Sequence, residues 1–390
     1  MRIAVVAESF LPHMNGVTNS VLQVLRHLRS QGHEAIVIAP SSSWIAGWTQ
    51  REDAGVAPSS VEGFRVHRLP SVPLSGYSSV RVAAGGVSRV RGILARFRPD
   101  VVHIASPFVL GWRAVQAAED LGIPSVAIYQ TEVPRYAARY GAPWLEDMLW
   151  SHVVRLHNTA TLTLAPSSFT LRQLHGLGVH RVHRWARGVD SQRFHPAKRD
   201  AGLRAELAPN GERLIGFVGR LAHEKQVEDL RVLADLPDTR LVIIGSGPLR
   251  EQLEQSLPGA HFAGFQGGED LARHVASLDL FVHPGESDTF GQTLQEAMAS
   301  GVPVVAVGRG GPLDLVDPSR TGWLYEPGNL GQLREQAADL LYDDAKRAAF
   351  AQAAWESVQG RTWPVLCEQL LGYYAKAIRV QQRREAVVGF

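Results

Sequence analysis

The feature that most constrains the fold is a repeated alternation of short apolar runs with stretches of helical periodicity. Strand-like runs occur in the first half at 3–7, 35–39, 101–104, 125–129 and 162–165. Between the first two runs, Val17, Val21, Val24 and Leu28 lie at helical spacing. A second series occurs at 213–218, 240–244, 261–263, 278–282, 302–307 and 322–325. Strands that alternate with helices predict the α/β class, with parallel sheets covered by helices on both faces.

The length of the chain and the break between the two series predict two domains. At 390 residues, the chain exceeds the size at which a single hydrophobic core usually keeps growing. A turn-rich segment at 187–196 separates the two series. We therefore expect an N-terminal domain at 1–190 and a C-terminal domain at 191–363, with a cleft between them.

Composition excludes several classes of partner and compartment. The formal net charge of +2 is too balanced to predict nucleic acid as a partner. The single cysteine, Cys367, excludes an internal disulfide and a cysteine metal cluster, and it fits a reducing compartment. The first residues begin a strand at once, so no signal peptide is expected. No apolar run approaches the ~20 residues that span a bilayer. These features predict a cytoplasmic protein.

The most informative motif lies at 283–317, directly after a strand-like run. It places Asp288 and Glu296 eight positions apart, with Phe290 and Gly291 between them and a helix expected to about residue 300. Ligands of open α/β sheets bind at the carboxyl ends of the strands. The free N–H groups of a helix N-terminus suit an anion, and a carboxylate accepts sugar hydroxyls. The motif therefore predicts a surface that holds a phosphate and a sugar together.

Two cations follow another strand of the second series. Arg220 and Lys225 lie in the segment Gly-Arg-Leu-Ala-His-Glu-Lys, five positions apart. Arg offers a planar fork and Lys a point charge, so the pair is suited to a diphosphate. On their own, the same two residues are also typical of a solvated helix start.

Taken together, these motifs resemble the signature of retaining, nucleotide-sugar-dependent glycosyltransferases of family 4. The family pattern, Glu, seven residues, Glu, reads here as Asp288, seven residues, Glu296, and Glu286 lies two positions before the first acid. The resemblance covers essentially the whole chain and is greatest for actinobacterial GDP-mannose-dependent α-mannosyltransferases that act on lipids. It implies the GT-B fold, with two Rossmann-like domains facing each other across a cleft. It also implies that a C-terminal helix at 364–390 packs back on the first domain.

The resemblance also implies roles for the donor-site residues. Arg220 and Lys225 would stabilise the leaving diphosphate, and Glu296 would accept the ribose hydroxyls. Asp288 would face the transferred sugar, although an Asp at this position is also a good helix cap. The remaining donor-site residues are expected to act largely through backbone groups: Phe290 and Gly291 at the sugar and phosphate, Phe265 near the base and Gly16 at a phosphate.

The acceptor side departs from the family pattern. Gln130 stands where many members have a His that contacts the donor sugar, and Gln cannot shuttle a proton. Gln130 is therefore expected to act only by hydrogen bonding. Glu132, His103 and Arg135 are candidate acceptor ligands. The structural alternative for Glu132 is a loop residue after a strand, and a lone His near a strand end is more often structural.

The chain contains no Asp-x-Asp triplet, the pair that metal-dependent transferases of the other major architecture place on the sugar diphosphate. Arg220 and Lys225 take the place of the metal in this interpretation. We therefore expect no metal requirement and no cofactor beyond the nucleotide-sugar substrate.

A basic amphipathic stretch at 81–98 suggests a third partner. It interleaves Arg89, Arg91 and Arg96 with apolar residues in a pattern expected to be helical. Such a pattern suits an anionic membrane surface, and it equally describes a helix that covers a sheet with a solvated basic face. The first interpretation places the protein peripherally on the inner face of the cell membrane.

The expected reaction moves mannose from GDP-mannose to a lipid or glycolipid hydroxyl with retention of configuration. Rival interpretations are glucosyl, N-acetylglucosaminyl or sulfoquinovosyl transfer from UDP-sugars, and an idle sugar-nucleotide-binding protein. An NAD-dependent enzyme would need an acidic residue after the second strand, where Ala39, Pro40 and Ser41 stand. The acceptor, the linkage and the oligomeric state are not encoded in recognisable motifs.

Overall fold

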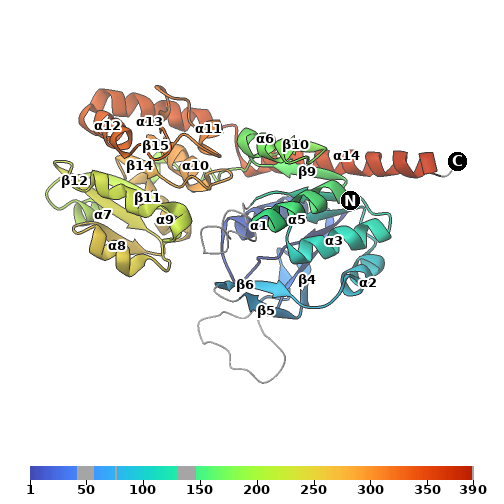
Figure 1. The fold of residues 1–390 in the computed structure, drawn as a ribbon. Helices are drawn as coiled ribbons and strands as arrows, with labels where there is room; N and C mark the ends of the chain where they lie inside the picture. The colour runs from blue at the N-terminus through green and yellow to red at the C-terminus, as the bar shows by residue number, and fades with distance from the viewer. Residues whose placement is uncertain (42–56, 75–76, 131–145, 389–390) are drawn as a thin grey trace, which may run out of the picture.

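The chain folds into two α/β domains, each built on its own sheet (Figure 1). The computed structural model describes residues 1–41, 57–74, 77–130 and 146–388. Within these residues, the first sheet has eight strands in the order β10-β9-β8-β7-β1-β2-β4-β3. The strands are β1 (Arg2–Val6), β2 (Glu34–Pro40), β3 (Ser60–Val61), β4 (Phe64–Leu69), β7 (Val101–Ile104), β8 (Ser125–Ile128), β9 (Leu162–Ala165) and β10 (Val182–Arg184). Among the described strands of this sheet, only β3 pairs antiparallel, with β4.

Helices cover both faces of the first sheet because residues of its strands alternate between two cores. Ile3 and Val5 of β1 share one core with helices α1 (Gly16–Ser30) and α14 (Trp363–Val388). The neighbouring residues Ala4 and Val6 share the other core with α2 (Val87–Phe97) and α3 (Val109–Asp120). Two further helices, α5 (Glu146–Thr159) and α6 (Ser168–Gly176), flank β9. This alternation is the burial pattern that the period of two in a strand dictates.

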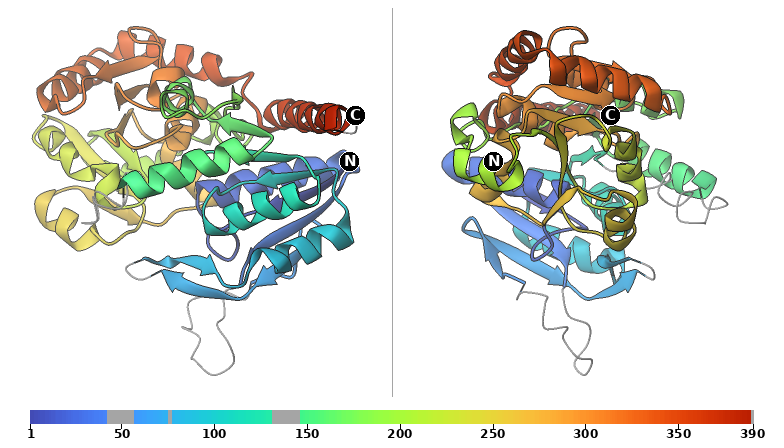
Figure 2. Two further views of the ribbon diagram at one scale, coloured as in Figure 1. Left: turned by 45° about the vertical axis from the view of Figure 1, so that its right-hand side comes forward. Right: turned by 90° about the vertical axis from the view of Figure 1, so that its left-hand side faces the viewer.

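The second sheet has six described strands, all parallel, in the order β13-β12-β11-β14-β15-β16. The strands are β11 (Arg213–Val218), β12 (Thr239–Ile244), β13 (His261–Gly264), β14 (Leu280–His283), β15 (Val304–Val307) and β16 (Gly322–Tyr325). The helices around it are α7 (Ala201–Leu207), α8 (Arg250–Ser256), α9 (Gly268–Ala276), α10 (Gln292–Ala299), α11 (Pro312–Leu315), α12 (Leu330–Tyr342) and α13 (Asp344–Val358). Figure 2 shows this domain from two further sides.

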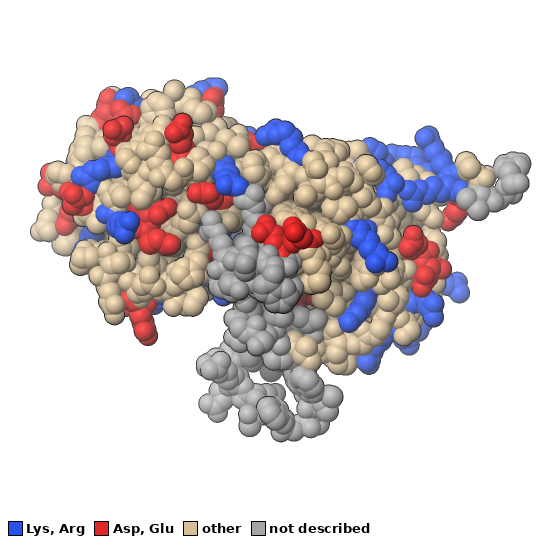
Figure 3. All heavy atoms as spheres, viewed as in Figure 1, with Lys and Arg blue, Asp and Glu red and all other residues tan. Residues whose placement is uncertain are grey.

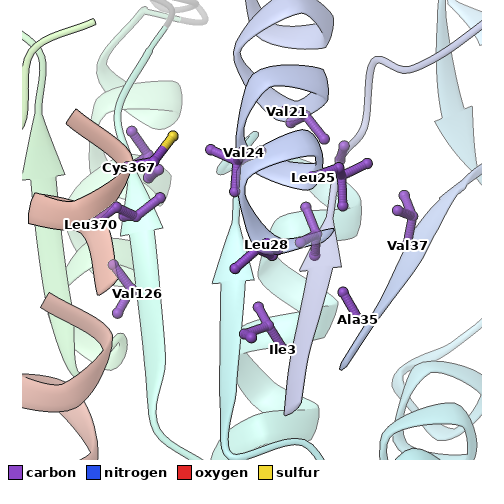
Figure 4. Close-up of a cluster of buried hydrophobic side chains, with 14 of the residues drawn as sticks. Ile3, Val21, Val24, Leu25, Leu28, Ala35, Val37, Val126, Cys367 and Leu370 are labelled. Carbon is purple, nitrogen blue, oxygen red and sulfur yellow. The ribbon is translucent and has the colours of Figure 1, made fainter. Parts of the chain in front are cut away.

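The chain crosses between the domains twice, and the two crossings lie side by side. Val189 pairs with Thr362 as an isolated parallel bridge, and the Val189 N–H donates to the Arg361 carbonyl at 2.8 Å. After the second crossing, α14 runs back along the first domain. Its residues Leu366, Leu370 and Tyr374 recur at helical spacing and are buried in the core with α1. Figure 4 shows Leu370 and Cys367 beside Val126 of the sheet.

The structure corrects two expectations about local elements. The basic stretch at 81–98 is not one helix, because Arg81 lies in β6 (Tyr77–Ala83) and α2 begins only at Val87. Strand β6 forms an antiparallel hairpin with β5 (Ser71–Leu74). Gly85 and Gly86 separate strand from helix, and Gly85 has a φ of 103°, which interrupts a helix. The stretch at 41–63 is rich in Ser, Gly, Pro and Trp, which predicts a loop throughout, yet it contains β3.

Candidate active site

Each sheet has a switch point, the place where the strand order reverses. In the second sheet, β12 and β13 lie on one side of β11, and the chain then returns to place β14 on its other side. In the first sheet, β2 lies on one side of β1 and β7 on the other. Open α/β sheets bind ligands at this place, outside the carboxyl ends of the strands. In the second sheet, the loop after β11 holds the two predicted cations and the loop after β14 holds the acidic motif.

Close backbone packing fixes the cation loop. The Gly219 N–H donates to the Ile244 carbonyl at 3.0 Å, and the Leu221 N–H donates to the Ser246 carbonyl at 3.0 Å. A Cβ on Gly245 would lie 1.9 Å from the Gly219 carbonyl oxygen, so only glycine fits there. Gly245 also has a φ of 145°, outside the range that other residues readily adopt. The Gly-Ser-Gly turn after β12 therefore shapes the cation loop.

Lys225 and Asp288 meet across the switch point of the second sheet. The Lys225 Nζ lies 2.5 Å from Asp288 Oδ1, and the His283 Nε2 lies 2.8 Å from Asp288 Oδ2. Burial acts to raise the pKa of Asp288, but Lys225 and His283 outweigh it and hold that pKa well below its usual range. Asp288 is therefore ionised at neutral pH, between Lys225 and His283. His283, the last residue of β14, was not predicted as a site residue, although the motif begins with it.

Beside this group, a second ionic cluster fixes the same loop. Glu286 accepts from Arg309 at 3.1 Å, and its backbone N–H donates to the Gln226 side chain at 3.0 Å. Gly310 has a φ of 70°, and a Cβ there would lie 2.5 Å from the Asp288 carbonyl oxygen. Glu286 is thus a partner of Arg309 rather than a second copy of Asp288. Arg220 is exposed at the rim of this region.

Helix α10 carries the second acidic residue of the motif. Gly291 precedes the helix with a φ of 91°, and Phe290 is buried in the core beneath it. Glu296 is buried, and its carboxylate accepts from Gln292 at 3.2 Å. Burial raises the pKa of Glu296 to about 7, against the opposing effect of the Gln292 hydrogen bond. A buried carboxyl with few partners is suited to accept hydroxyl groups from a ligand.

Gln130 links the first domain to both the crossing segment and the acidic motif. Its Oε1 accepts from the Arg187 guanidinium at 2.6 Å, and its backbone carbonyl accepts from the Thr289 hydroxyl at 2.9 Å. A Cβ on Gly16 would lie 2.9 Å from the Arg187 guanidinium. Gln130, Arg187, Thr289 and Gly16 therefore meet where the two domains touch. Arg187 was expected only as part of a linker, and no motif in the sequence marks it.

The remaining predicted site residues lie elsewhere. His103 is buried under α14, and its Nδ1 lies 2.5 Å from the Tyr374 hydroxyl. This surrounding is that of a core histidine, and burial lowers its pKa to about 3. The Phe265 side chain is 70% exposed after β13. Glu132 and Arg135 lie outside the described residues.

Two features of the described residues bear on metals and membranes. Among them, no group of three or more His, Cys, Asp or Glu side chains is placed to hold a metal ion. Within the same residues, no helix has both the length and the apolar character needed to cross a bilayer.

Comparisons with known proteins agree with the fold and the motifs. The model of "Glycosyltransferase Family 4" matches residues 14–193, and that of "Glycosyl transferases group 1" matches residues 199–357. The chain is 47% identical to a GDP-mannose-dependent α-mannosyltransferase of Mycolicibacterium smegmatis, over 99% of this chain and 100% of that one. It is 45% identical to the protein of that name from Corynebacterium glutamicum, over 98% and 91%. It is 35% identical to a sulfoquinovosyl transferase of Arabidopsis thaliana, over 93% and 71%.

Solved structures share the architecture at low sequence identity. A sucrose-phosphate synthase from Thermosynechococcus elongatus superposes with a TM-score of 0.80 at 21% identity, covering 96% of this chain and 98% of that one. Anabaena HepE in complex with UDP-glucose superposes with a TM-score of 0.76 at 20% identity, covering 96% and 100%. These two likenesses show the fold alone. With the two family models and the near-full-length relatives, they establish that this chain belongs to glycosyltransferase family 4 and has the two-domain GT-B fold.

Proposed function

We propose that this enzyme transfers mannose from GDP-mannose to a hydroxyl of a lipid or glycolipid, with retention of configuration. The observation that carries the proposal is the meeting of Lys225, Asp288 and His283 at the switch point of the second sheet, with Glu296 on the following helix. The relatives that are 45% and 47% identical and named for GDP-mannose support the choice of donor.

The nucleotide would bind to the second domain. Glu296 would accept the ribose hydroxyls, since it is buried and has only the Gln292 side chain as a described hydrogen-bond partner. The diphosphate would lie between Arg220, Lys225 and the N-terminus of α10, where free N–H groups favour an anion. Lys225 already contacts a carboxylate, so a diphosphate would join an existing charge cluster. Phe265, at the exposed end of β13, would lie beside the base.

The chemical step then needs positioning and charge stabilisation. The bond between the sugar C1 and the phosphate oxygen breaks, and a bond from C1 to the acceptor oxygen forms on the same face. The acceptor proton passes to an oxygen of the departing diphosphate, which leaves as GDP. Arg220 and Lys225 stabilise the charge that develops on it, and Asp288 holds the hexose. Gln130, whose Oε1 is engaged by Arg187, holds the domains rather than moving a proton.

We propose that the two cations replace a metal ion and that no cofactor is needed. The absence of an Asp-x-Asp triplet from the sequence motivates this. We also propose that the enzyme works peripherally at the inner face of the membrane through an anionic lipid surface. The arginines of α2 support this, since Arg89, Arg91 and Arg96 are exposed while Val90, Ile93 and Leu94 are buried.

A donor panel tests the function. We expect GDP-mannose, and not UDP- or ADP-sugars, to raise the melting temperature of the purified protein and to support transfer to lipid extracts in micelles. Transfer should persist in excess EDTA. The alternative favoured by a specific observation is sulfoquinovosyl or other UDP-sugar transfer, because of the relative that is 35% identical. A preference for UDP-sugars supports that alternative, and nucleotide binding without any transfer supports an idle protein. Loss of transfer in EDTA that Mg²⁺ restores would refute the metal proposal.

A further inference from the structure

The switch point of the first sheet holds a buried acidic residue that the donor site does not use. Glu8 follows β1, and the loop 105–108 follows β7 on the other side of the switch point. The two segments are adjacent, because the Ala105 N–H donates to the Val6 carbonyl at 2.9 Å. Glu8 therefore occupies the place in the first sheet that the cation loop occupies in the second.

One oxygen of Glu8 is fixed and the other has no partner. Oε1 accepts from the Leu110 N–H, in the first turn of α3, at 3.1 Å. Oε2 is buried and has no hydrogen-bond partner among the described residues. The Glu8 side chain is only 7% exposed, so water does not replace that partner freely. A buried oxygen without a hydrogen bond costs free energy that a ligand group can recover.

Hydrogen bonds beside Glu8 lead from the first sheet toward the acidic motif of the second domain. The Ala105 carbonyl, at the end of β7, accepts from the Gln130 side chain at 3.2 Å. The Gln130 backbone carbonyl in turn accepts from Thr289, the residue after Asp288. The switch point of the first sheet is thus joined to the acidic motif through two hydrogen bonds of a single residue.

We propose that Glu8 positions the acceptor, its Oε2 sharing a hydrogen bond with an oxygen of the hydroxyl-bearing head of the lipid. This assignment rests on the proposed function. Burial raises the pKa of Glu8 to about 8, against the opposing effects of the Leu110 and Val109 N–H groups and Arg113. Glu8 is therefore mainly a neutral carboxylic acid at pH 7, a group that donates one hydrogen bond and accepts others. Such a group suits a polyol without attracting the anionic donor.

Two variants separate acceptor binding from a merely structural role at α3. Glu8→Gln keeps a donor and an acceptor of hydrogen bonds, whereas Glu8→Leu removes both at similar size. With GDP-mannose and polar lipids of Corynebacterium glutamicum in micelles, we expect Glu8→Leu to raise the acceptor KM about tenfold or more. Hydrolysis of GDP-mannose by water and binding of GDP should stay within about twofold. Glu8→Gln should stay within about threefold of the parent, and Glu119→Gln, an exposed control on α3, should match the parent.

The pH dependence gives a second measure. For the parent, kcat/KM for the acceptor should fall as the pH rises through about 8, because the neutral form of Glu8 is lost. Glu8→Gln should abolish this fall. Arg113 and Arg187 stay charged throughout this range, and burial keeps His103 neutral. A His13→Gln variant tests the histidine in the same loop and should retain the fall.

The outcomes distinguish the assignment from the proposed function. A parent that transfers no mannose to lipid refutes the proposed function, and the assignment with it. A normal parent, with an acceptor KM of the folded Glu8→Leu variant within twofold, refutes the assignment alone. Equal losses of GDP binding and acceptor binding also refute it, since they indicate a general disturbance. If Glu8→Leu does not fold, a fall near pH 8 that persists in Glu8→Gln refutes the assignment.

Discussion

At the switch point of the second sheet, the acidic and basic side chains are already paired, whereas at that of the first sheet an acid lies buried with one oxygen unpartnered. Lys225 and His283 hold Asp288 ionised, while burial keeps Glu8 mainly neutral at pH 7. The two switch points share a topology and differ in charge.

This difference in charge indicates how the enzyme could bind its two substrates on two domains of the same architecture. A nucleoside diphosphate carries negative charge, so its site needs cations, here Arg220 and Lys225. A sugar or glycerol head carries hydroxyl groups, so its site needs uncharged hydrogen-bonding groups. Because the side chains at the two switch points differ in charge, each substrate would be directed to its own domain.

The largest expected effect is on turnover through the cations of the second domain. Arg220→Ala and Lys225→Ala should each lower kcat about a hundredfold, since loss of one charged donor at a developing oxyanion costs on the order of 3 kcal/mol. Lys225→Ala also deprives Asp288 of a cation and should therefore lower the melting temperature. Arg320→Ala, at a side chain that is 72% exposed, is the matched control. Turnover within twofold of the parent in either variant contradicts the assignment.

Glu296→Gln should weaken GDP binding about ten- to a hundredfold, because charge-assisted hydrogen bonds contribute roughly 1.5–3 kcal/mol. In the parent, GDP affinity should fall as the pH drops below about 7, since burial raises the pKa of Glu296 to that value and protonation removes the acceptor charge. The variant should lose this dependence. Calorimetry at pH 6 and pH 8 checks both expectations, and a parent whose affinity is the same at the two values would contradict them.

The same residue should affect stability in the opposite direction. A carboxyl whose pKa is higher in the folded than in the unfolded chain stabilises fully at low pH, and its contribution is lost as the pH rises to the folded value. For Glu296, the loss occurs between about 4.5 and 7. Without ligand at pH 8, Glu296→Gln should therefore be at least as stable as the parent. A clear drop in its melting temperature would mean that the carboxylate stabilises the empty site.

The sequence identified the charged residues at the second switch point and missed the acid at the first. The acidic motif and the cations are visible because charged residues directly follow apolar runs and lie near glycines that fix tight loops. Glu8 also follows an apolar run, yet a single acid without a second motif has no recognisable spacing. His283 reads as the end of a strand, and its role appears only when Asp288 turns back onto it.

Contacts between distant segments account for what the sequence could not show about particular residues. His103 lies at a strand end in the sequence, but α14 covers it through Tyr374, 271 positions away. The pairing of Arg187 with Gln130 likewise joins a crossing segment to a strand end 57 positions earlier. The strand β4 was not predicted because its sequence, FRVHRL, carries three basic residues in six. The strand is defined by its parallel pairing with β2, and a local sequence pattern does not reveal that pairing.

Asp288→Asn should separate the sugar from the nucleotide. If Asp288 holds the hexose, free GDP should bind within about twofold of the parent, while GDP-mannose should bind about tenfold more weakly, in line with one charge-assisted hydrogen bond. Calorimetry with both ligands measures the difference. His283→Asn removes one donor to Asp288 and leaves Lys225 in place, so its effect should be smaller and of the same kind. Equal losses for GDP and GDP-mannose would show that Asp288 shapes the loop rather than binding the sugar.

The smallest expected effect compares the surfaces of the two domains. Lys and Arg side chains, drawn in blue, gather over the C-terminal half of α14 and around α2, both of which belong to the first domain (Figure 3). If the first domain contacts anionic lipid, neutralising one exposed arginine of α2 should weaken binding about fivefold, since each basic residue near the surface contributes about 1 kcal/mol. Arg89→Gln is suited to this test because Arg89 is exposed and lies beside the buried Val90. Cosedimentation with phosphatidylglycerol vesicles at low salt measures it, and added salt should release the parent. Arg320→Gln removes the same charge from the second domain and should bind as the parent does. Equal weakening by both substitutions would mean that net charge, rather than one face of the first domain, governs attraction to the membrane.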